Sequence, residues 1–295
     1  MTAPPPGVEA DAGLARLTTI GTGGPARFLA RPATSAELAE VLAWASSEGL
    51  PIAVIGLGSN LLVADEGYDG VAVHLEGALA AIEIDGASVR AGGGASLAAV
   101  VRRATEAGLA GIEFGCAIPG TVGGAVRMNA GAYGREIRDV LGAAEVVSAT
   151  GTRSGGPGDL DLSYRHSNVR GSEVVAGAVL ELERGVRDEI RARVHEMQRR
   201  RSESQPRKAR TFGSVFKNPA EGRGAGALIE ACGLKGHAIG GARISTVHAN
   251  FIENAGEARS ADVAALVALA RTCVRERFGV DLEHEVELLG PVTLR

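Results

Sequence analysis

Three short segments, far apart along the chain, carry side chains that could together stabilise and protonate a developing negative charge. Arg165 in LSYRHS is a permanent cation whose planar guanidinium can hold a carboxylate through two parallel hydrogen bonds. Ser214 in GSVFKNP offers a small hydroxyl that can donate or relay one proton. Glu285 in EHEVELLG is a carboxyl in the closing apolar strand, where it could hold a proton.

Each of these residues also has an ordinary structural explanation. Arg165 fits a surface ion pair, Ser214 fits a turn hydroxyl, and Glu285 fits an outward residue of an alternating strand. Glu283 and Glu287 share that alternation, so strand parity places all three glutamates on one face and does not choose among them. Taken singly, the structural explanations are favoured.

Other catalytic chemistries find little support. The chain has no GxSxG, no HExxH and no GK dipeptide, which excludes a P-loop, and its six histidines are scattered. His237 and His248 are better explained as structural residues than as ligands. Cys116, Cys232 and Cys273 lack CxxC spacing, which is typical of buried thiols in a reducing cytoplasm rather than of disulfides or a zinc site.

Three glycine-rich segments could hold phosphate, because glycine permits positive φ angles and close backbone approach to an anion. They are TIGTGGPARF (19–28), IGLGSNLL (55–62) and IPGTVGGAVRMNAGAYG (118–134). The first fits the Rossmann spacing, but Pro25 and the lack of a flanking strand and helix argue against that use. One such segment is equally explained by tight turns, whereas three favour an extended dinucleotide lying across two small domains.

The elements that must position these residues can be placed from periodicity and caps. Thr34 and Glu37 form a capping-box pattern, and Gly279 ends the longest apolar helical pattern. We expect helices at 34–49, 96–107, 188–204, 226–232 and 260–279, and strands within 51–65, 81–97, 143–149, 173–183 and 281–290. This irregular order predicts an α+β fold rather than a doubly wound sheet.

Length and composition set the class of protein. The chain has 295 residues, of which 45% are hydrophobic and 22% charged, enough for a sizeable core in two or three domains. No apolar run reaches membrane-span length, and the acidic, proline-rich start does not resemble a signal peptide. The net charge of −4 disfavours a general nucleic-acid surface. We therefore expect a soluble cytoplasmic protein that binds neither nucleic acid nor membrane.

Eight motifs in order now resemble one family. They are TTIGTGGPA, GLGSNLLVAD, IPGTVGGAVRMNAGAYG, YRHS, GSVFKNP, LIEACGLKG, HANFIEN and LEHEVELLG. From about Leu17 to Gly290 the chain resembles the UDP-N-acetylenolpyruvoylglucosamine reductases (UDP-N-acetylmuramate dehydrogenases), flavoproteins of bacterial cell-wall synthesis. The short gap after Ser167 is similar to the compact subgroup that lacks an inserted tyrosine-bearing loop.

The resemblance implies an α+β fold with a two-subdomain FAD-binding module of the vanillyl-alcohol-oxidase type and a smaller α+β substrate-binding domain. The expected boundaries are a loose tail over 1–14, FAD-binding subdomains over 15–76 and 77–195, the substrate-binding domain over 196–290, and a C-terminal tail over 291–295. A monomer is the expected state.

The resemblance also implies the chemistry. NADPH delivers a hydride to FAD, and the hydride then passes to the β-carbon of the enolpyruvyl ether of a UDP-sugar, which makes the chain an oxidoreductase acting on a C=C bond. Ser214 matches the residue that protonates the α-carbon. Arg165 and Glu285 match the residues that stabilise the charge developing there.

The remaining site residues are implied in the same way. Tyr133, Tyr164, Lys217 and Asn218 are expected to contact the substrate. The expected cofactor contacts are Gly56, Gly58, Ser59, Asn60, Leu61, Pro119, Gly120, Thr121, Gly123, Gly124, Asn129 and Gly131. The basic runs Arg199 to Arg201 and Arg207 to Arg210 fit either the substrate diphosphate or a solvated helix end.

Two other readings stay open. Another FAD oxidoreductase of the same superfamily would keep the three glycine-rich segments but has no need of YRHS, GSVFKNP and the terminal glutamate together. The chain could also be a non-catalytic flavin- or nucleotide-binding regulator, in which Ser214 would have no catalytic function.

Overall fold

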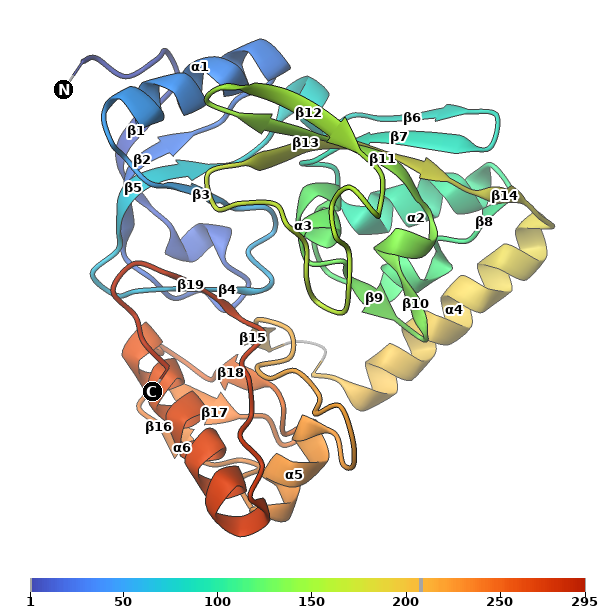
Figure 1. Ribbon diagram of the computed structural model, residues 1–295. Helices are drawn as coiled ribbons and strands as arrows, with labels where there is room; N and C mark the ends of the chain where they lie inside the picture. Colours follow the sequence, from blue (N-terminus) through green and yellow to red (C-terminus); the bar gives the residue numbers. More distant parts are fainter. Residues whose placement is uncertain (1, 207–208, 295) are drawn as a thin grey trace. The chain divides into compact units, whose positions relative to one another are not determined.

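The structure is a computed structural model that describes residues 2–206 and 209–294 (Figure 1). The chain divides into two compact units. The first unit consists of Met1–Ala10, Phe28–Leu57 and Gly70–Arg201, and the second unit of Asp11–Arg27, Gly58–Asp69 and Ser202–Arg295. Two short N-terminal stretches therefore group with the C-terminal third of the chain. The consecutive domain boundaries expected from the resemblance stay a prediction.

The first sheet has four strands in the order β1-β2-β5-β3. Its strands are β1 (Glu9–Gly13), β2 (Pro25–Ala30), β3 (Ile52–Val54) and β5 (Tyr68–Val73). Because β1 pairs within this sheet, the expectation of a loose tail over 1–14 is wrong for that stretch.

Helix α1 (Ser35–Ser47) begins and ends where the sequence predicts. The Thr34 hydroxyl accepts the N–H of Glu37 at 3.2 Å, and the Glu37 carboxylate accepts the N–H of Ala33 at 2.7 Å. These bonds satisfy donors that the first helical turn leaves without an intrahelical partner. Beyond the last turn, Gly49 takes a φ of +67°, which stops the helix.

The second sheet is antiparallel and has five strands in the order β12-β11-β13-β7-β6. They are β6 (Ile82–Asp85), β7 (Ser88–Gly92), β11 (Leu141–Ser148), β12 (Gly151–Gly155) and β13 (Val174–Glu181). The hairpin predicted at Asp85-Gly86 joins β6 to β7, with Gly86 at a φ of +63°. Helices α2 (Leu97–Glu106) and α3 (Val122–Arg127) pack on this sheet (Figure 1).

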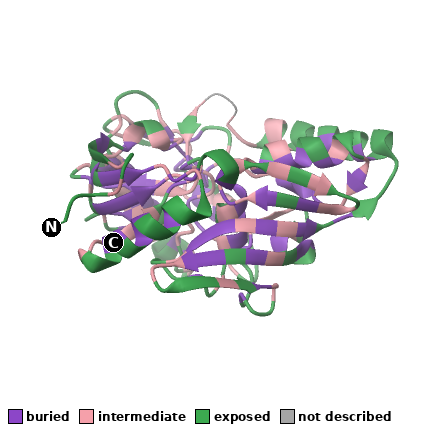
Figure 2. Ribbon diagram, turned by 90° about the horizontal axis from the view of Figure 1, so that it is seen from above, coloured by how far each residue is buried: buried purple, intermediate pink, exposed green. Residues whose placement is uncertain are grey.

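Side-chain alternation divides the central strands between two hydrophobic cores. Val146 and Val175 pack in the core that holds α2 and α3, whereas their neighbours Val147 and Val174 pack in the core that holds α1. Successive residues of a strand face opposite sides, so one strand serves both cores. Figure 2 shows the resulting bands of buried and less buried residues along the strands.

Smaller elements complete the first unit. Two-stranded pairs are formed by β8 (Leu109–Ala110) with β14 (Glu183–Arg184) and by β9 (Gly131–Ala132) with β10 (Arg135–Glu136). Helix α4 (Arg187–Ser204) buries only Ile190 and Val194. Short 3-10 turns lie at Ala15–Leu17 in the second unit and at Gly77–Ala80, Glu113–Ala117 and Ile137–Asp139 in the first.

The second unit has its own sheet, in the order β15-β18-β17-β16. Its strands are β15 (Arg210–Thr211), β16 (Ala238–Ile239), β17 (Ala242–Ile244) and β18 (Ile252–Asn254). Helix α5 is Ala225–Ala231, and helix α6 is Ser260–Phe278. Helix α6 buries Val263, Leu266, Val267, Ala270 and Val274, as its sequence pattern predicts, and ends at Gly279 with a φ of +68°.

The 58–69 stretch belongs to this unit for a physical reason. Its β4 (Leu61–Val63) pairs in parallel with β19 (Glu287–Leu289). The Asp65 carboxylate accepts the N–H groups of Ser260 and Ala261 at 2.9 and 3.0 Å. A carboxylate at the start of α6 satisfies unpaired donors and complements the helix dipole.

The predicted closing strand over 281–290 is only partly correct. Within it, the strand proper is Glu287–Leu289, and the chain bends at Val286. The alternation of Glu283, Glu285 and Glu287 therefore does not follow a single strand. Among the described residues, none of the helices combines the length and apolarity that a bilayer crossing requires.

Candidate functional site

The first unit contains a pocket that five glycines help to line. Gly56, Thr121, Gly123 and Gly124, all expected cofactor contacts, line it together with Gly93 and Gly94. The other lining residues are Val54, Ile55, His74, Leu75, Arg127, Val169, Glu173 and Val175. The second and third glycine-rich segments therefore both contribute to one pocket.

Two kinds of glycine line this pocket. A Cβ on Gly93 would lie 1.9 Å from the Val175 carbonyl oxygen, and one on Gly56 would lie 2.5 Å from the Thr121 hydroxyl oxygen. These glycines let the protein's own segments pack. A Cβ on Gly124 would have Thr121 Oγ1 at 3.8 Å as its nearest neighbour, an ordinary van der Waals distance, so the protein leaves room for it. Gly124 is the position where a bound molecule could approach the backbone closely.

The backbone donors of this segment are partly committed to the fold. The Gly123 N–H donates to the Gly93 carbonyl at 2.8 Å, and the Val122 N–H donates to the Ala95 carbonyl at 2.9 Å. These two groups therefore anchor α3 to the preceding turn instead of facing an anion.

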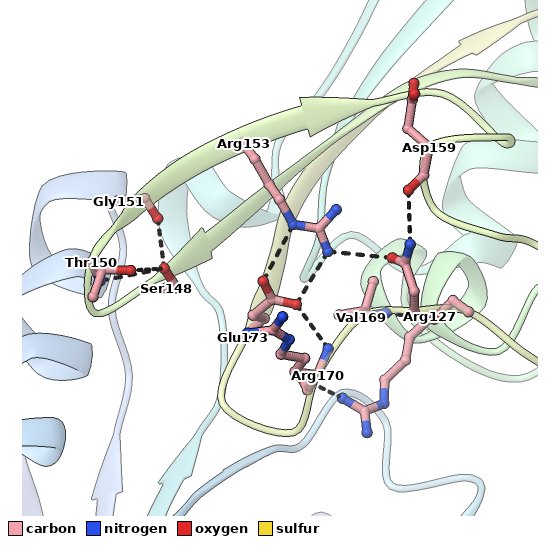
Figure 3. Close-up of polar contacts among 11 residues, drawn as sticks. Arg127, Ser148, Thr150, Gly151, Arg153, Asp159, Val169, Arg170 and Glu173 are labelled. Carbon is pink, nitrogen blue, oxygen red and sulfur yellow. Dashed lines mark hydrogen bonds and ion pairs between the residues drawn. The ribbon is translucent and has the colours of Figure 1, made fainter.

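A charged network borders the pocket, and the sequence reading did not name its members. The Glu173 carboxylate accepts from Arg153 Nε and Nη2 at 3.2 and 3.1 Å and from the Arg170 N–H at 2.8 Å (Figure 3). The Arg127 Nη1 donates to the Arg170 carbonyl at 3.2 Å. Since Arg153 compensates Glu173, Arg127 brings positive charge to the pocket wall. Its place inside the third glycine-rich segment was the signal that could have identified it.

The Glu173 network gives a stability prediction. The hydrogen bonds from Arg153 lower the pKa of Glu173 below its ordinary value of 4.5. A carboxyl whose pKa is lowered by folding stabilises the folded state above its unfolded value, and that stabilisation is lost as the pH falls through the folded value. We expect Glu173→Gln to lower the free energy of unfolding by about 1–2 kcal/mol at pH 7.

The difference in the free energy of unfolding between Glu173→Gln and the parent protein should shrink as the pH falls below about 4.5. Urea unfolding at several pH values measures it. A difference that stayed constant down to pH 3 would contradict the ion pair as its source.

Asn129 was expected to contact the cofactor, and the structure gives it a structural role. Its side chain is fully buried, at 0% exposure, and φ is +39°. Its Nδ2 donates to Glu136 Oε2 at 2.8 Å and to the Ser163 carbonyl at 3.0 Å, and its Oδ1 accepts the Arg138 N–H at 3.0 Å. The Asn129 side chain thus holds the turn that carries Tyr164 and Arg165, and its contact with the cofactor stays a prediction.

That turn presents Tyr164 and Arg165 at its tip. Ser163 and His166 exchange two backbone hydrogen bonds of 3.2 and 3.0 Å. Arg165 has a φ of +54°, which costs a non-glycine residue about 1–2 kcal/mol. Its guanidinium lies 5.0 Å from the Tyr164 ring centre, and Nη2 donates to the Gly131 carbonyl at 3.2 Å. The fold thus holds a strained cation beside an exposed tyrosine.

The first basic run, Arg199 to Arg201, belongs to helix α4, and Tyr133 contacts the same helix. The Tyr133 hydroxyl donates to the Met197 carbonyl at 2.7 Å. Arg199 and Arg200 both pair with Glu196, and Arg201 donates to the Ala117 carbonyl, just before the expected cofactor residues Pro119 and Gly120. These contacts agree with the structural explanation of the run. In the second run, Arg207 and Lys208 lie outside the described residues.

In the second unit, Ser214 and Glu285 lie in two segments that pair with each other. The Glu285 N–H donates to the Val215 carbonyl at 2.8 Å, and the Lys217 N–H donates to the Glu283 carbonyl at 2.9 Å. The ladder thus sets Val215 opposite Glu285 and places Ser214 one residue away. Both Ser214 and Glu285 are partly exposed, whereas Glu283 and Glu287 are exposed. The tertiary structure therefore distinguishes the glutamates that parity could not.

The second glycine-rich segment continues into this pair. The Asn60 Nδ2 donates to the Glu285 carbonyl at 3.0 Å, and the Glu287 N–H donates to the Asn60 carbonyl at 3.0 Å. The Ser59 carbonyl accepts the Gly213 N–H at 2.9 Å. Asn60 was expected to contact the cofactor, but here its carboxamide holds the backbone of Glu285. The expected contacts Gly58 and Leu61 lie in the same unit, Leu61 as the first residue of β4.

The two expected substrate residues that follow Ser214 are bound to protein groups. Lys217 Nζ lies 2.5 Å from Glu283 Oε1, a carboxylate that is mostly exposed. The Asn218 Oδ1 accepts the Ala225 N–H at 3.0 Å, at the start of α5. The structure therefore pairs the backbone of the Ser214 segment with that of the Glu285 segment and places Arg165 in the other unit. That all three share one cavity stays a prediction.

Within 2–206 and 209–294, no group of three or more His, Cys, Asp or Glu side chains could hold a metal ion.

Comparison with known sequence families gives two matches. Residues 26–154 match the family described as "FAD binding domain", and residues 205–289 match "UDP-N-acetylenolpyruvoylglucosamine reductase, C-terminal domain". The first match contains the expected cofactor residues of both units. The second contains Ser214 and Glu285.

Individual relatives match along nearly the whole chain. The UDP-N-acetylenolpyruvoylglucosamine reductase 2 of Symbiobacterium thermophilum is 43% identical over 94% of this chain and 90% of its own length. The UDP-N-acetylenolpyruvoylglucosamine reductase of Heliobacterium modesticaldum is 42% identical over 94% and 89%.

A solved structure agrees with these sequence matches. UDP-N-acetylenolpyruvylglucosamine reductase from Thermus caldophilus matches with a TM-score of 0.83 and 37% identity, over 96% of this chain and 98% of that one. The expected fold class, α+β with an FAD-binding module and a further domain, is confirmed.

Proposed function

Because the chain belongs to the UDP-N-acetylenolpyruvoylglucosamine reductase family, we propose that it reduces the enolpyruvyl group of UDP-N-acetylglucosamine enolpyruvate to give UDP-N-acetylmuramate. NADPH is the proposed reductant and FAD the proposed cofactor. The reaction would serve peptidoglycan precursor synthesis in the cytoplasm. The observation that carries the proposal is the pairing of the Ser214 segment with the Glu285 segment in one unit.

The residues present fit a flavin dinucleotide. The glycine-lined pocket lies within the first unit, and Arg127 supplies a positive charge that suits a phosphate-containing ligand. When bound, FAD would accept a hydride from NADPH and pass it to the substrate. Gly124 and Arg127 are the residues we propose to contact it in this pocket.

The chain's own groups would then handle charge and proton. Addition of hydride to the β-carbon leaves negative charge on the α-carbon and the adjoining carboxylate. Arg165 and Glu285 would stabilise that charge, which requires them to be held in place beforehand. Ser214 Oγ would donate its proton to the α-carbon, a downhill transfer because a carbanion is a far stronger base than an alkoxide.

The pocket gives a prediction that does not depend on turnover. We expect Gly124→Ala to leave the flavin-free protein as stable as before or more stable, because alanine favours a helix by about 1 kcal/mol over glycine. Its methyl group would enter the pocket, so the Kd for FAD should rise by about tenfold or more. Fluorescence titration of the flavin-free protein with FAD, together with thermal unfolding, measures both effects.

Gly93→Ala is the matched control for this experiment. Its methyl group would meet the Val175 carbonyl, so the flavin-free protein itself should lose stability. An unchanged FAD affinity in Gly124→Ala would remove this pocket from the proposed cofactor site.

Stopped-flow absorbance at the flavin band tests the function as a whole. The purified protein should be yellow, NADPH should bleach it, and UDP-N-acetylglucosamine enolpyruvate should restore the colour. Bleaching without recovery by this substrate would favour another FAD oxidoreductase. A flavin that NADPH cannot reduce would favour a regulator, and a colourless protein that does not bind added FAD would overturn the proposal.

A further inference from the structure

We propose that Asn250 is a positioning residue for Ser214. Its side-chain carboxamide binds the backbone N–H and C=O of Phe216, and its main-chain carbonyl binds the backbone N–H of Val215. Asn250 Oδ1 accepts the Phe216 N–H at 3.0 Å, and Nδ2 donates to the Phe216 carbonyl at 2.8 Å. The Asn250 carbonyl accepts the Val215 N–H at 2.9 Å. The inference rests on the proposed role of Ser214 as proton donor.

The carboxamide replaces a neighbouring strand at this point. Its oxygen and the N–H that is cis to that oxygen point the same way, so together they can pair with the N–H and C=O of a single residue, as a residue of a neighbouring strand does. The opposite edge of the same segment pairs with Glu283 and Glu285. Residues 215–217 are thus held on two edges, and the Ser59 carbonyl holds Gly213 on the other side of Ser214. The Ser214 hydroxyl therefore takes its place from backbone bonds to its two neighbours.

Asn250 is itself fixed by a closed loop. The Ser245 N–H donates to the Phe251 carbonyl at 2.8 Å, and the Phe251 N–H donates to the His248 carbonyl at 3.0 Å. The Asn250 N–H donates to His248 Nδ1 at 3.2 Å. Only 3% of Asn250 is exposed. A buried carboxamide that uses its donor and its acceptor on one residue sets a single position for that residue.

His248 is suited to this loop because its ring stays neutral. Burial, together with the charge of Lys235, lowers the pKa of His248. A neutral ring leaves Nδ1 free to accept the Asn250 N–H, which a protonated ring could not do. A Cβ on Gly226 would lie 2.7 Å from His248 Cε1, so helix α5 closes over the ring at a glycine.

The two half-reactions separate this role from a merely structural one. Ser214 would act only after hydride has left the flavin, so loosening it should spare reduction of the flavin by NADPH. We expect Asn250→Ala holoenzyme to be reduced at the usual rate and to be reoxidised by the enolpyruvyl substrate about 10²-fold more slowly, the scale of a small misplacement of a reacting group. The solvent deuterium isotope effect on reoxidation should rise as proton transfer becomes limiting.

Asn254→Ala is the matched control. Asn254 also lies in the second unit and makes three bonds to backbone groups, those of Ile20, Gly256 and Ala258, but none to residues 213–217. We expect Asn254→Ala to lower the thermal stability about as much as Asn250→Ala does. The rates of both half-reactions should stay within about twofold of those of the parent protein. If Asn250→Ala does not fold, Asn250→Asp keeps the shape and the acceptor while removing the donor to Phe216, and the same slowed reoxidation is expected.

The positioning role would be overturned if the Asn250 variants were reoxidised at a rate within about twofold of the parent. It would also be overturned if reoxidation slowed as much in Asn254→Ala as in Asn250→Ala. Failure of the proposed function is distinguishable, because the parent protein itself would then not be reoxidised by the enolpyruvyl substrate, or Ser214→Ala would be reoxidised at the parent rate. Either result would also remove the basis of the Asn250 proposal.

Discussion

Replacing Ser214 with alanine is expected to slow the reoxidation of the reduced flavin by the enolpyruvyl substrate by about 10²-fold or more, the range for a lost acid catalyst. Reduction by NADPH should be unchanged, because Ser214 takes no part in it under the proposed mechanism. The backbone around residue 214 is held by the bonds to Gly213 and Val215, so alanine should leave the fold in place. Stopped-flow measurement of the two half-reactions tests both statements.

Ser214→Cys is the control for this variant. A thiol is a stronger acid than an alcohol, with an ordinary pKa of about 8.5, so it keeps a proton donor at the same backbone position. We expect it to recover a measurable part of the reoxidation rate. Parent-like reoxidation in Ser214→Ala would take Ser214 out of the mechanism.

Replacing Arg165 with glycine is expected to separate catalysis from stability. Loss of a group that stabilises developing charge should lower the rate of substrate reduction by about 10²- to 10³-fold. Relief of the positive φ contributes about 1–2 kcal/mol of stability. The lost hydrogen bond to Gly131 costs about 1 kcal/mol, and the added chain entropy of glycine costs about 0.5–1 kcal/mol. The net change in the free energy of unfolding should therefore stay within about 1 kcal/mol.

Glu257→Gly is the matched control for Arg165→Gly. Glu257 also has a positive φ, of +53°, and lies exposed in a loop of the second unit. It should change neither half-reaction, and it tests the stability effect of glycine alone. An Arg165→Gly protein that unfolded several kcal/mol more easily would show that the arginine is chiefly structural, while one with full activity would remove it from the site.

Local signals in the sequence were enough for helices α1, α2, α4, α5 and α6, but not for α3 or for strands such as β1, β2 and β5. The Thr34 cap and the glycine stops at Gly49 and Gly279 act within a few residues of the helix ends that they define. The hairpin at Asp85-Gly86 likewise depends on two adjacent residues. Such signals can be read without knowing the fold, because the interacting groups are neighbours in the chain.

The glycine-rich segments show a feature that could not be predicted from neighbouring residues alone. The three segments were expected to hold a dinucleotide, and the second and third line one pocket of the first unit. Glycine by itself does not tell whether the space beside it is filled by the protein or open to a ligand. Gly93 and Gly124 have the same side chain and opposite surroundings. Arg127 likewise became a pocket residue only when α3 packed onto the sheet.

The asparagines make the same point about side chains. A carboxamide can bind a cofactor or the protein's own backbone equally well. The sequence by itself determined the ends of α1 and α6 and the hairpin at Asp85-Gly86, because those depend on nearby residues. Only the tertiary structure decided that Asn60 holds Glu285, which lies 225 positions away, and that Asn250 holds the segment of Ser214. A hydrogen bond between distant residues exists only once folding has brought them together.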